Sequence, residues 1–255
     1  MDRQNRTKLN QLLQNWPRGS VAPTSWLLRQ GISRQLLDRY EQYGWVTRVA
    51  KGVVIRKGED VSWVGVMLAL QEFLEMSVWV GGKTALRLRG LGHYIPMKKK
   101  LTINLYSATL SRLPRWVKDF EKTADFQFQK TQMFSEKLKT IKTFSDYEED
   151  KLKIKISTPE RAVFEMLESV PSTQSFEEAE LIFENLANMR PQVLQSHLQL
   201  CRSVKAKRLF LYLAEKSGHT WFLKLNTSKI DLGKGKRAIV PHGKLDSKYQ
   251  IIVPR

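Results

Sequence analysis

The residues able to do chemistry do not stand in a pattern that defines a known reaction. The four histidines, His93, His197, His219 and His242, have no cysteine or carboxylate at metal-ligand spacing. The chain also lacks the G-x-S-x-G motif of α/β-hydrolases and the H-E-x-x-H motif of zinc peptidases. We therefore expect no enzymatic activity, no metal site and no cofactor.

The segment Gly81-Gly82-Lys83-Thr84 is similar to the end of a phosphate-binding loop. The complete loop has a glycine five residues before the second of these glycines, where this chain has Ser77. Strand-forming residues stand between the two positions, and they would not form a backbone cradle for a phosphate. We therefore predict a tight turn from strand to helix.

The single cysteine, Cys201, excludes an internal disulfide, which suits a reducing cytoplasm. Its neighbours Arg202 and Lys205 could lower its pKa and make it reactive. It ends a predicted apolar helix, however, and we interpret it as a structural residue.

Two basic clusters stand in the last quarter of the chain. The first opens a helix predicted over 204–216, and the second lies between strand-like runs near residue 235. One interpretation is a solvated helix start followed by a basic turn. The alternative is a surface for an anionic partner, made of Lys205, Lys207, Arg208, Lys234, Lys236 and Arg237.

The N-terminal quarter predicts three helices and a hairpin. Leu9, Leu12, Leu13 and Trp16 form one apolar helical face. A short helix capped by Thr24 or Ser25 follows, and then a helix over 34–43 capped by Ser33. Two β-rich runs flank Lys51-Gly52 and predict the hairpin. This order is that of a winged helix-turn-helix domain.

In that fold the third helix enters the major groove of DNA and the hairpin lies along the backbone. The expected base-edge contacts are Arg34, Gln35 and Arg39, and the expected phosphate contacts are Arg48, Lys51, Arg56 and Lys57. The alternative is a small three-helix domain with a solvated charged face.

Net charge supports an anionic partner, with nucleic acid ahead of a membrane surface. The chain of 255 residues carries a formal charge of +18 and has a pI near 10.0. Residues 1–58 hold 11 Lys and Arg against 3 Asp and Glu. The apolar stretch 61–80 is interrupted by Gln71, Glu72 and Glu75, and the start has no signal-peptide core. We expect a cytoplasmic protein with no membrane contact.

The expected fold class is α+β, with a winged helix-turn-helix domain over 1–94 and a mixed α/β domain over 95–255. Further helices are predicted over 61–76, 160–167, 176–189, 191–201 and 204–216, and strands over 101–106, 126–134, 151–156, 221–225, 236–240 and 249–253.

Several strings give the chain a family resemblance. They are Gly81-Gly-Lys-Thr-Ala-Leu, Gly90-Leu-Gly-His-Tyr, Thr158-Pro-Glu-Arg-Ala-Val-Phe-Glu-Met-Leu, Cys201-Arg-Ser-Val-Lys-Ala-Lys-Arg-Leu-Phe-Leu-Tyr-Leu-Ala-Glu, Gly218-His-Thr-Trp, Ile230-Asp-Leu-Gly-Lys-Gly-Lys-Arg and Leu245-Asp-Ser-Lys-Tyr-Gln-Ile-Ile-Val-Pro. With them the chain resembles the AbiEi antitoxins of type IV toxin–antitoxin (abortive infection) systems over nearly its whole length.

This resemblance implies two roles. The N-terminal domain would bind inverted repeats in double-stranded DNA at its own promoter and repress the operon. The C-terminal domain would neutralise a nucleotidyltransferase-like toxin, and this neutralisation need not involve a stable complex between the two proteins. The alternatives are an enzyme, for which no residue set is found, and a DNA- or RNA-binding regulator without antitoxin activity.

Overall fold

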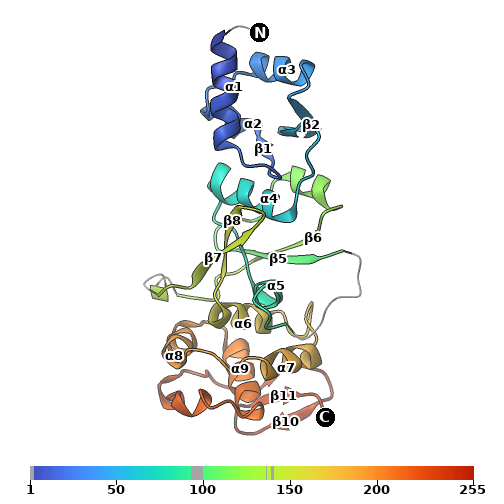
Figure 1. The fold of residues 1–255 in the computed structure, drawn as a ribbon. Helices are drawn as coiled ribbons and strands as arrows, with labels where there is room; N and C mark the ends of the chain where they lie inside the picture. The colour runs from blue at the N-terminus through green and yellow to red at the C-terminus, as the bar shows by residue number, and fades with distance from the viewer. Residues whose placement is uncertain (1–2, 93–99, 136, 139–140) are drawn as a thin grey trace. The chain divides into compact units, whose positions relative to one another are not determined.

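The computed structural model describes residues 3–92, 100–135, 137–138 and 141–255 (Figure 1). The chain forms two compact units that are interleaved in sequence. The first unit consists of Met1–Trp79, Lys98–Lys130 and Asp146–Lys155, and the second of Val80–Met97, Thr131–Ser145 and Ile156–Arg255. The predicted boundary at 94/95 and His93 fall in 93–99, outside the described residues.

The first unit begins with three helices and a small antiparallel sheet. The elements are α1 (Arg3–Asn15), β1 (Ala22–Pro23), α2 (Thr24–Arg29), α3 (Arg34–Gln42), β2 (Val46–Ala50) and β3 (Val53–Arg56), with strand order β1-β3-β2. Buried Leu9, Leu12 and Trp16 confirm the predicted apolar face of α1. The predicted hairpin is also confirmed, with Gly52 at φ 80° in its turn.

The caps of the two short helices differ from each other. The Ser33 side chain accepts a hydrogen bond from the backbone N–H of Leu36 at 3.2 Å, which confirms the predicted cap of α3. The predicted cap of α2 by Thr24 or Ser25 is wrong. Pro23 occupies that position because its extended backbone already belongs to β1.

The remainder of the first unit is helix followed by strands. A helix predicted over 61–76 is present as α4 (Trp63–Leu68), continued by the π-helix η1 (Ala69–Phe73). Strands β5 (Thr102–Ser107) and β6 (Asp125–Lys130) are parallel, with the 3₁₀ helix η2 (Arg115–Phe120) between them in sequence. The predicted strand over 126–134 therefore ends earlier, at Lys130.

A five-stranded sheet has the order β6-β5-β4-β8-β7. Its other members are β4 (Trp79–Val80), β7 (Phe144–Glu149) and β8 (Leu152–Ser157). Leu152, Ile154 and Ile156 on β8 are buried in alternation with exposed lysines, as the period of two predicts.

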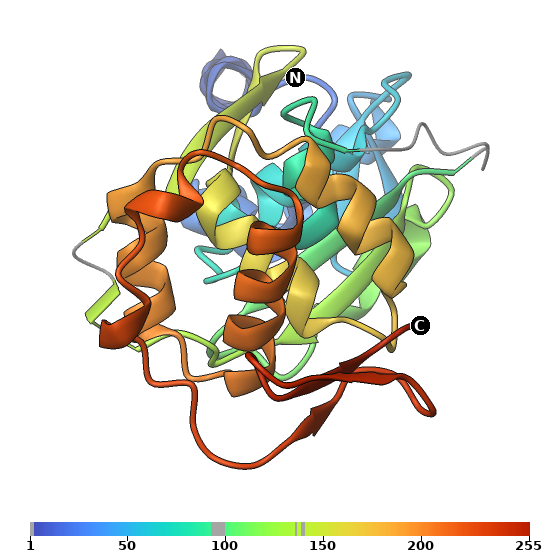
Figure 2. The same ribbon diagram turned by 90° about the horizontal axis from the view of Figure 1, so that it is seen from below.

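The second unit is mainly helical (Figure 2). Its helices are α5 (Gly82–Arg87), α6 (Pro159–Glu168), α7 (Phe176–Glu184), α8 (Pro191–Leu200) and α9 (Val204–Lys216). Helix α6 contacts α5, α8 and α9. In the core, Phe164 of α6 stacks on Phe210 of α9 with ring centroids 4.7 Å apart. The predicted bounds of α9 are confirmed, whereas α7 ends five residues earlier than predicted.

The C-terminal segment forms a three-stranded sheet of order β10-β11-β9, made of β9 (Arg237–Ala238), β10 (Lys244–Asp246) and β11 (Ile251–Val253). The predicted strand over 221–225 is wrong, because this segment forms the 3₁₀ helix η4 (Phe222–Lys224). Local hydrogen bonds satisfy its backbone, and the Trp221 indole N–H bonds to the Leu186 carbonyl at 2.7 Å. The described residues contain no helix long and apolar enough to cross a membrane.

Candidate nucleic-acid interface

Helix α3 presents a polar face to solvent. Leu36, Leu37 and Tyr40 are buried beneath it. The three residues predicted to read base edges, Arg34, Gln35 and Arg39, are all exposed. The helical period thus placed Leu36, Leu37 and Tyr40 correctly, whereas Tyr43, which it also assigns to the apolar face, is 61% exposed after the helix ends at Gln42. The role of the polar face in DNA recognition stays a prediction.

Arg48 on β2 forms ion pairs with two carboxylates of α3, those of Asp38 and Glu41. Its Nε lies 2.8 Å from Oε2 of Glu41, and its Nη2 hydrogen-bonds to Asp38. All three side chains are more than one third exposed, so the pairs contribute little stability. They orient the hairpin against α3 and neutralise part of the charge that the sequence assigned to a phosphate contact.

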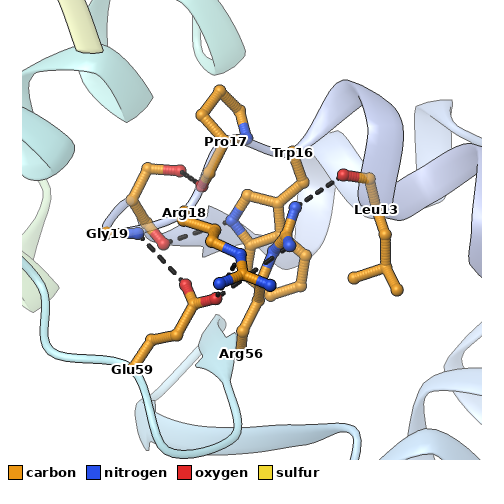
Figure 3. Close-up of polar contacts among 8 residues, drawn as sticks. Leu13, Trp16, Pro17, Arg18, Gly19, Arg56 and Glu59 are labelled. Carbon is orange, nitrogen blue, oxygen red and sulfur yellow. Dashed lines mark hydrogen bonds and ion pairs between the residues drawn. The ribbon is translucent and has the colours of Figure 1, made fainter. Parts of the chain in front are cut away.

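The guanidinium of Arg56 on β3 points toward Leu13 and Trp16 (Figure 3). Its side chain is 13% exposed, and Nη2 donates to the Leu13 carbonyl at 2.6 Å. The guanidinium also lies 5.6 Å from the centroid of the Trp16 ring and 4.0 Å from Glu59. The predicted phosphate contact by Arg56 is therefore corrected: this guanidinium anchors the end of α1 on the hairpin.

Unlike Arg56, the two lysines of the hairpin are exposed. Lys51 lies at the turn and Lys57 directly after β3. Neither forms an ion pair with another described residue. They are the hairpin cations that remain free to meet a phosphate.

A second group of cations, which the sequence patterns above did not predict, lies beside the hairpin in the same unit. Helix η2 contacts β2. It buries Trp116 and Val117 and exposes Arg115 and Lys118. The three-residue spacing of these cations around a buried apolar pair was the available signal. Asp119 between the helix faces is also exposed and lowers the local positive charge.

The Gly81–Thr84 segment joins β4 to α5 as the predicted turn, and a carboxylate of the chain itself occupies the helix start. The Gly82 N–H donates to Oε2 of Glu165 at 3.0 Å. Ser157 donates to the same oxygen at 2.8 Å, and Arg161 lies 2.7 Å from the other. The backbone donor that a phosphate would need is therefore already bonded to Glu165.

Cys201 and His197 are buried groups of the second unit. Burial raises the pKa of the Cys201 thiol to about 12, which supports the structural interpretation. His197 packs between Phe134 and Phe164, and its Nδ1 lies 2.8 Å from the Val193 carbonyl. Burial lowers the pKa of His197 to about 4, so its ring is neutral at pH 7. The described residues contain no group of three metal-binding side chains.

The first C-terminal basic cluster is turned inward. Lys205 donates to the Val170 carbonyl at 2.9 Å and to that of Glu168. Lys207 is 4% exposed and bonds to the Asp231 carbonyl, while Arg208 is 3% exposed. Arg208 donates to the carbonyls of Leu232 at 2.8 Å, Gly235 at 2.5 Å, Gly233 at 3.1 Å and Gln250 at 3.1 Å. The predicted surface for an anionic partner is therefore wrong in these three residues, because their charged groups bond to carbonyls of the chain itself.

The second C-terminal cluster is exposed. Lys234, Lys236 and Arg237 all reach solvent. Burial lowers the pKa of Arg208, and the charge of nearby Arg237 lowers it further. The exposed cations therefore lie close to the buried guanidinium of Arg208, and both add to the positive charge of this segment.

A helical head with a basic hairpin, combined with a second unit that carries a basic loop, is typical of a nucleic-acid-binding regulator. Two family models match the chain: the AbiEi antitoxin N-terminal domain of transcriptional regulators over 5–97, and the transcriptional regulator described as AbiEi antitoxin of the type IV TA system over 100–254. The chain belongs to this AbiEi antitoxin family, which confirms the resemblance seen in the sequence. The family is one of transcriptional regulators, and in general it implies DNA and a toxin as partners.

The fold is similar to that of the Rv2827c protein from Mycobacterium tuberculosis, known from a crystal structure. The similarity has a TM-score of 0.59 at 13% sequence identity and covers 99% of this chain and 92% of that chain. A mixed α/β arrangement of helices and several sheets is thus shared along nearly the whole chain. A comparison with curated proteins finds no match.

Proposed function

We propose that this protein is an antitoxin with two separable roles. It represses its own operon by binding inverted repeats in the promoter through a winged helix-turn-helix head. It also neutralises a nucleotidyltransferase-like toxin encoded beside it. The observation that carries the DNA-binding role is the exposed face of α3, with three side chains suited to base edges beside a basic hairpin.

The contacts divide by type. Arg34, Gln35 and Arg39 would read bases, because Arg suits guanine and Gln suits adenine. Lys51 and Lys57 would bind phosphates and supply affinity without sequence preference. Arg48 is a positioning residue in this proposal, and Arg56 is a structural one.

The η2 cations extend this surface in the proposal. Arg115 and Lys118 are exposed on a helix that contacts β2, the outer strand of the hairpin. Phosphates that run along the hairpin would pass near them. They would add salt-dependent affinity and leave sequence preference unchanged.

The test of operator recognition is a gel shift with promoter DNA and a scrambled duplex of equal length. Arg34→Ala with Arg39→Ala should reduce discrimination by at least about 30-fold, since each bidentate base contact is worth about 1–3 kcal/mol and two such contacts are removed. The matched control is Arg202→Ala with Arg255→Ala, which removes two exposed arginines of the second unit. Unchanged discrimination in the first variant would remove α3 as the recognition helix.

Neutralisation should be tested in the full chain rather than in a 95–255 fragment. The second unit includes Val80–Met97, and Gly82 from that segment donates a backbone N–H to buried Glu165. The fragment would lack this donor. Toxin co-expression should show rescue by the α3 variant, which keeps the second unit intact. Loss of rescue by that variant would tie neutralisation to DNA binding.

A further inference from the structure

Two buried cations of α9 lack an anionic partner among the described residues. Buried lysine and arginine side chains are normally paired with carboxylates. Lys207 and Arg208 instead bond to backbone carbonyls of the segment 231–235, and Arg208 bonds to Gln250 as well. Backbone dipoles satisfy the hydrogen bonds, but they leave the net charge of both groups uncompensated.

These hydrogen bonds also fix which way the loop amides point. The carbonyls of Asp231, Leu232, Gly233 and Gly235 are directed at the two cations. In a trans peptide, the N–H of the following residue points away from the carbonyl. The N–H groups that follow these carbonyls are therefore turned away from the buried cations.

One of these four amides is already used. The Gly233 N–H donates to Oδ1 of Asp231 at 2.8 Å. The amides of Leu232, Lys234 and Lys236 have no acceptor among the described residues. The loop thus has three backbone donors unused by any described residue, and each follows a carbonyl that is bonded to Lys207 or Arg208.

Two glycines allow this conformation. Gly233 and Gly235 have φ of 63° and 73°, on either side of Lys234. Residues with side chains rarely adopt such values, and glycine does so freely. A Cβ on Gly233 would also lie 2.9 Å from Val204, whereas the space around Gly235 is open. The backbone is therefore shaped by glycine and held by Arg208 before any ligand arrives.

Exposed side chains add charge to the same side. Lys234, Lys236 and Arg237 are all exposed. The carboxylate of Asp231 accepts the Gly233 amide, and no ion pair joins it to these three side chains. Free amides beside flexible cations are the donor set that binds phosphate groups in proteins.

We propose that the loop Asp231–Arg237 is a preorganised phosphate-binding site, suited to the phosphates of a nucleotide or of an RNA strand. Arg208 and Lys207 are its positioning residues, and Lys234, Lys236 and Arg237 are its contacts. This deepens the proposed antitoxin role and rests on it for biological meaning. Such a site would bring the antitoxin to a phosphate-bearing molecule that the toxin uses, with no need for a stable protein complex.

The test is direct binding by the full-length protein, separate from toxin rescue. Amide spectra should be recorded with pyrophosphate and, in a second arm, with a 12-nucleotide single-stranded RNA. The amide signals of Lys234 and Lys236 should shift in at least one arm. Shifts with pyrophosphate identify a small phosphate compound as sufficient, and shifts with RNA alone identify a strand as the ligand. Unshifted loop signals in both arms would overturn the proposal.

Two variant pairs separate geometry from charge. Gly235→Ala strains the loop without changing its charge, and Gly218→Ala is its control, with φ of 67° and equally open surroundings. We expect Gly235→Ala to weaken binding at least fivefold relative to this control.

The charge pair compares Lys234→Gln with Lys236→Gln against Lys142→Gln with Lys224→Gln, two exposed lysines outside the loop. If the two lysine double variants weakened binding equally, general positive charge would bind the ligand, which would contradict the proposal. Equal binding by the two glycine variants would likewise show that the loop conformation does not matter. If phosphate binding is lost while toxin rescue persists, the antitoxin function stands and the loop is not its route. If the wild-type protein binds phosphate but does not rescue cells from the toxin, the binding site stands and the proposed antitoxin function fails.

Discussion

Replacing Arg56 by methionine distinguishes a structural arginine from a DNA contact. Methionine keeps much of the apolar stem and removes the guanidinium. The lost hydrogen bond to the Leu13 carbonyl is charge-assisted and worth about 1.5–3 kcal/mol. Loss of the contact with the Trp16 ring adds about 0.5–1 kcal/mol. The pair with Glu59, at 4.0 Å, adds little. We expect a total destabilisation of about 2–4 kcal/mol.

Because the chain has two units, amide hydrogen exchange is the suitable assay. Peptides from the second half of α1 should exchange roughly 30- to 1,000-fold faster in Arg56→Met, since about 1.4 kcal/mol corresponds to a factor of ten. Promoter binding measured where the variant is folded should keep the wild-type dependence on salt, because no phosphate contact is lost.

Lys57→Met is the matched control, since it changes an exposed cation one residue further along the chain. It should leave exchange in α1 within about 0.5 kcal/mol of wild type. It should also lower the slope of log affinity against log salt by about 0.9. If Arg56→Met showed unchanged exchange and a reduced salt slope, Arg56 would be a phosphate contact and would not anchor α1.

Three further outcomes follow from the described contacts. Arg115→Ala with Lys118→Ala should lower the salt slope by up to about 2 while operator preference is retained; an unchanged slope would place η2 away from DNA. His197 has a folded-state pKa near 4 against 6.5 when free, so the stability it provides is complete above pH 6.5 and is lost as pH falls toward 4. That loss approaches about 3 kcal/mol. The free energy of unfolding in urea should therefore fall less between pH 7 and pH 4 in His197→Phe than in wild type. An equal fall in both proteins would show that this histidine does not contribute to the pH dependence. Cys201 should resist iodoacetamide at pH 8 until urea is added, because at a pKa near 12 only about one thiol in ten thousand is ionised; rapid labelling of the folded protein would contradict its burial.

Local sequence patterns predicted much of the local structure. Ser33 at the start of α3, the Lys51-Gly52 turn and the bounds of α9 follow from capping, turn chemistry and helical period, which depend on residues close in the chain. The strand predicted over 221–225 failed because a strand needs a distant partner, and here local 3₁₀ hydrogen bonds satisfy the backbone.

The sequence by itself determined the family, the excess of positive charge and the exposed face of α3. Tertiary structure decided which cations are available to a partner. Arg56 and Arg208 look no different in sequence from Lys57 and Lys234, yet each donates to carbonyls 24 or more residues away. A helical or strand period gives the direction of a side chain from its own element, whereas the acceptors come from segments that only the folded chain brings near. For this reason the basic block near the C-terminus divides into buried residues that shape a loop and exposed residues that can meet a ligand.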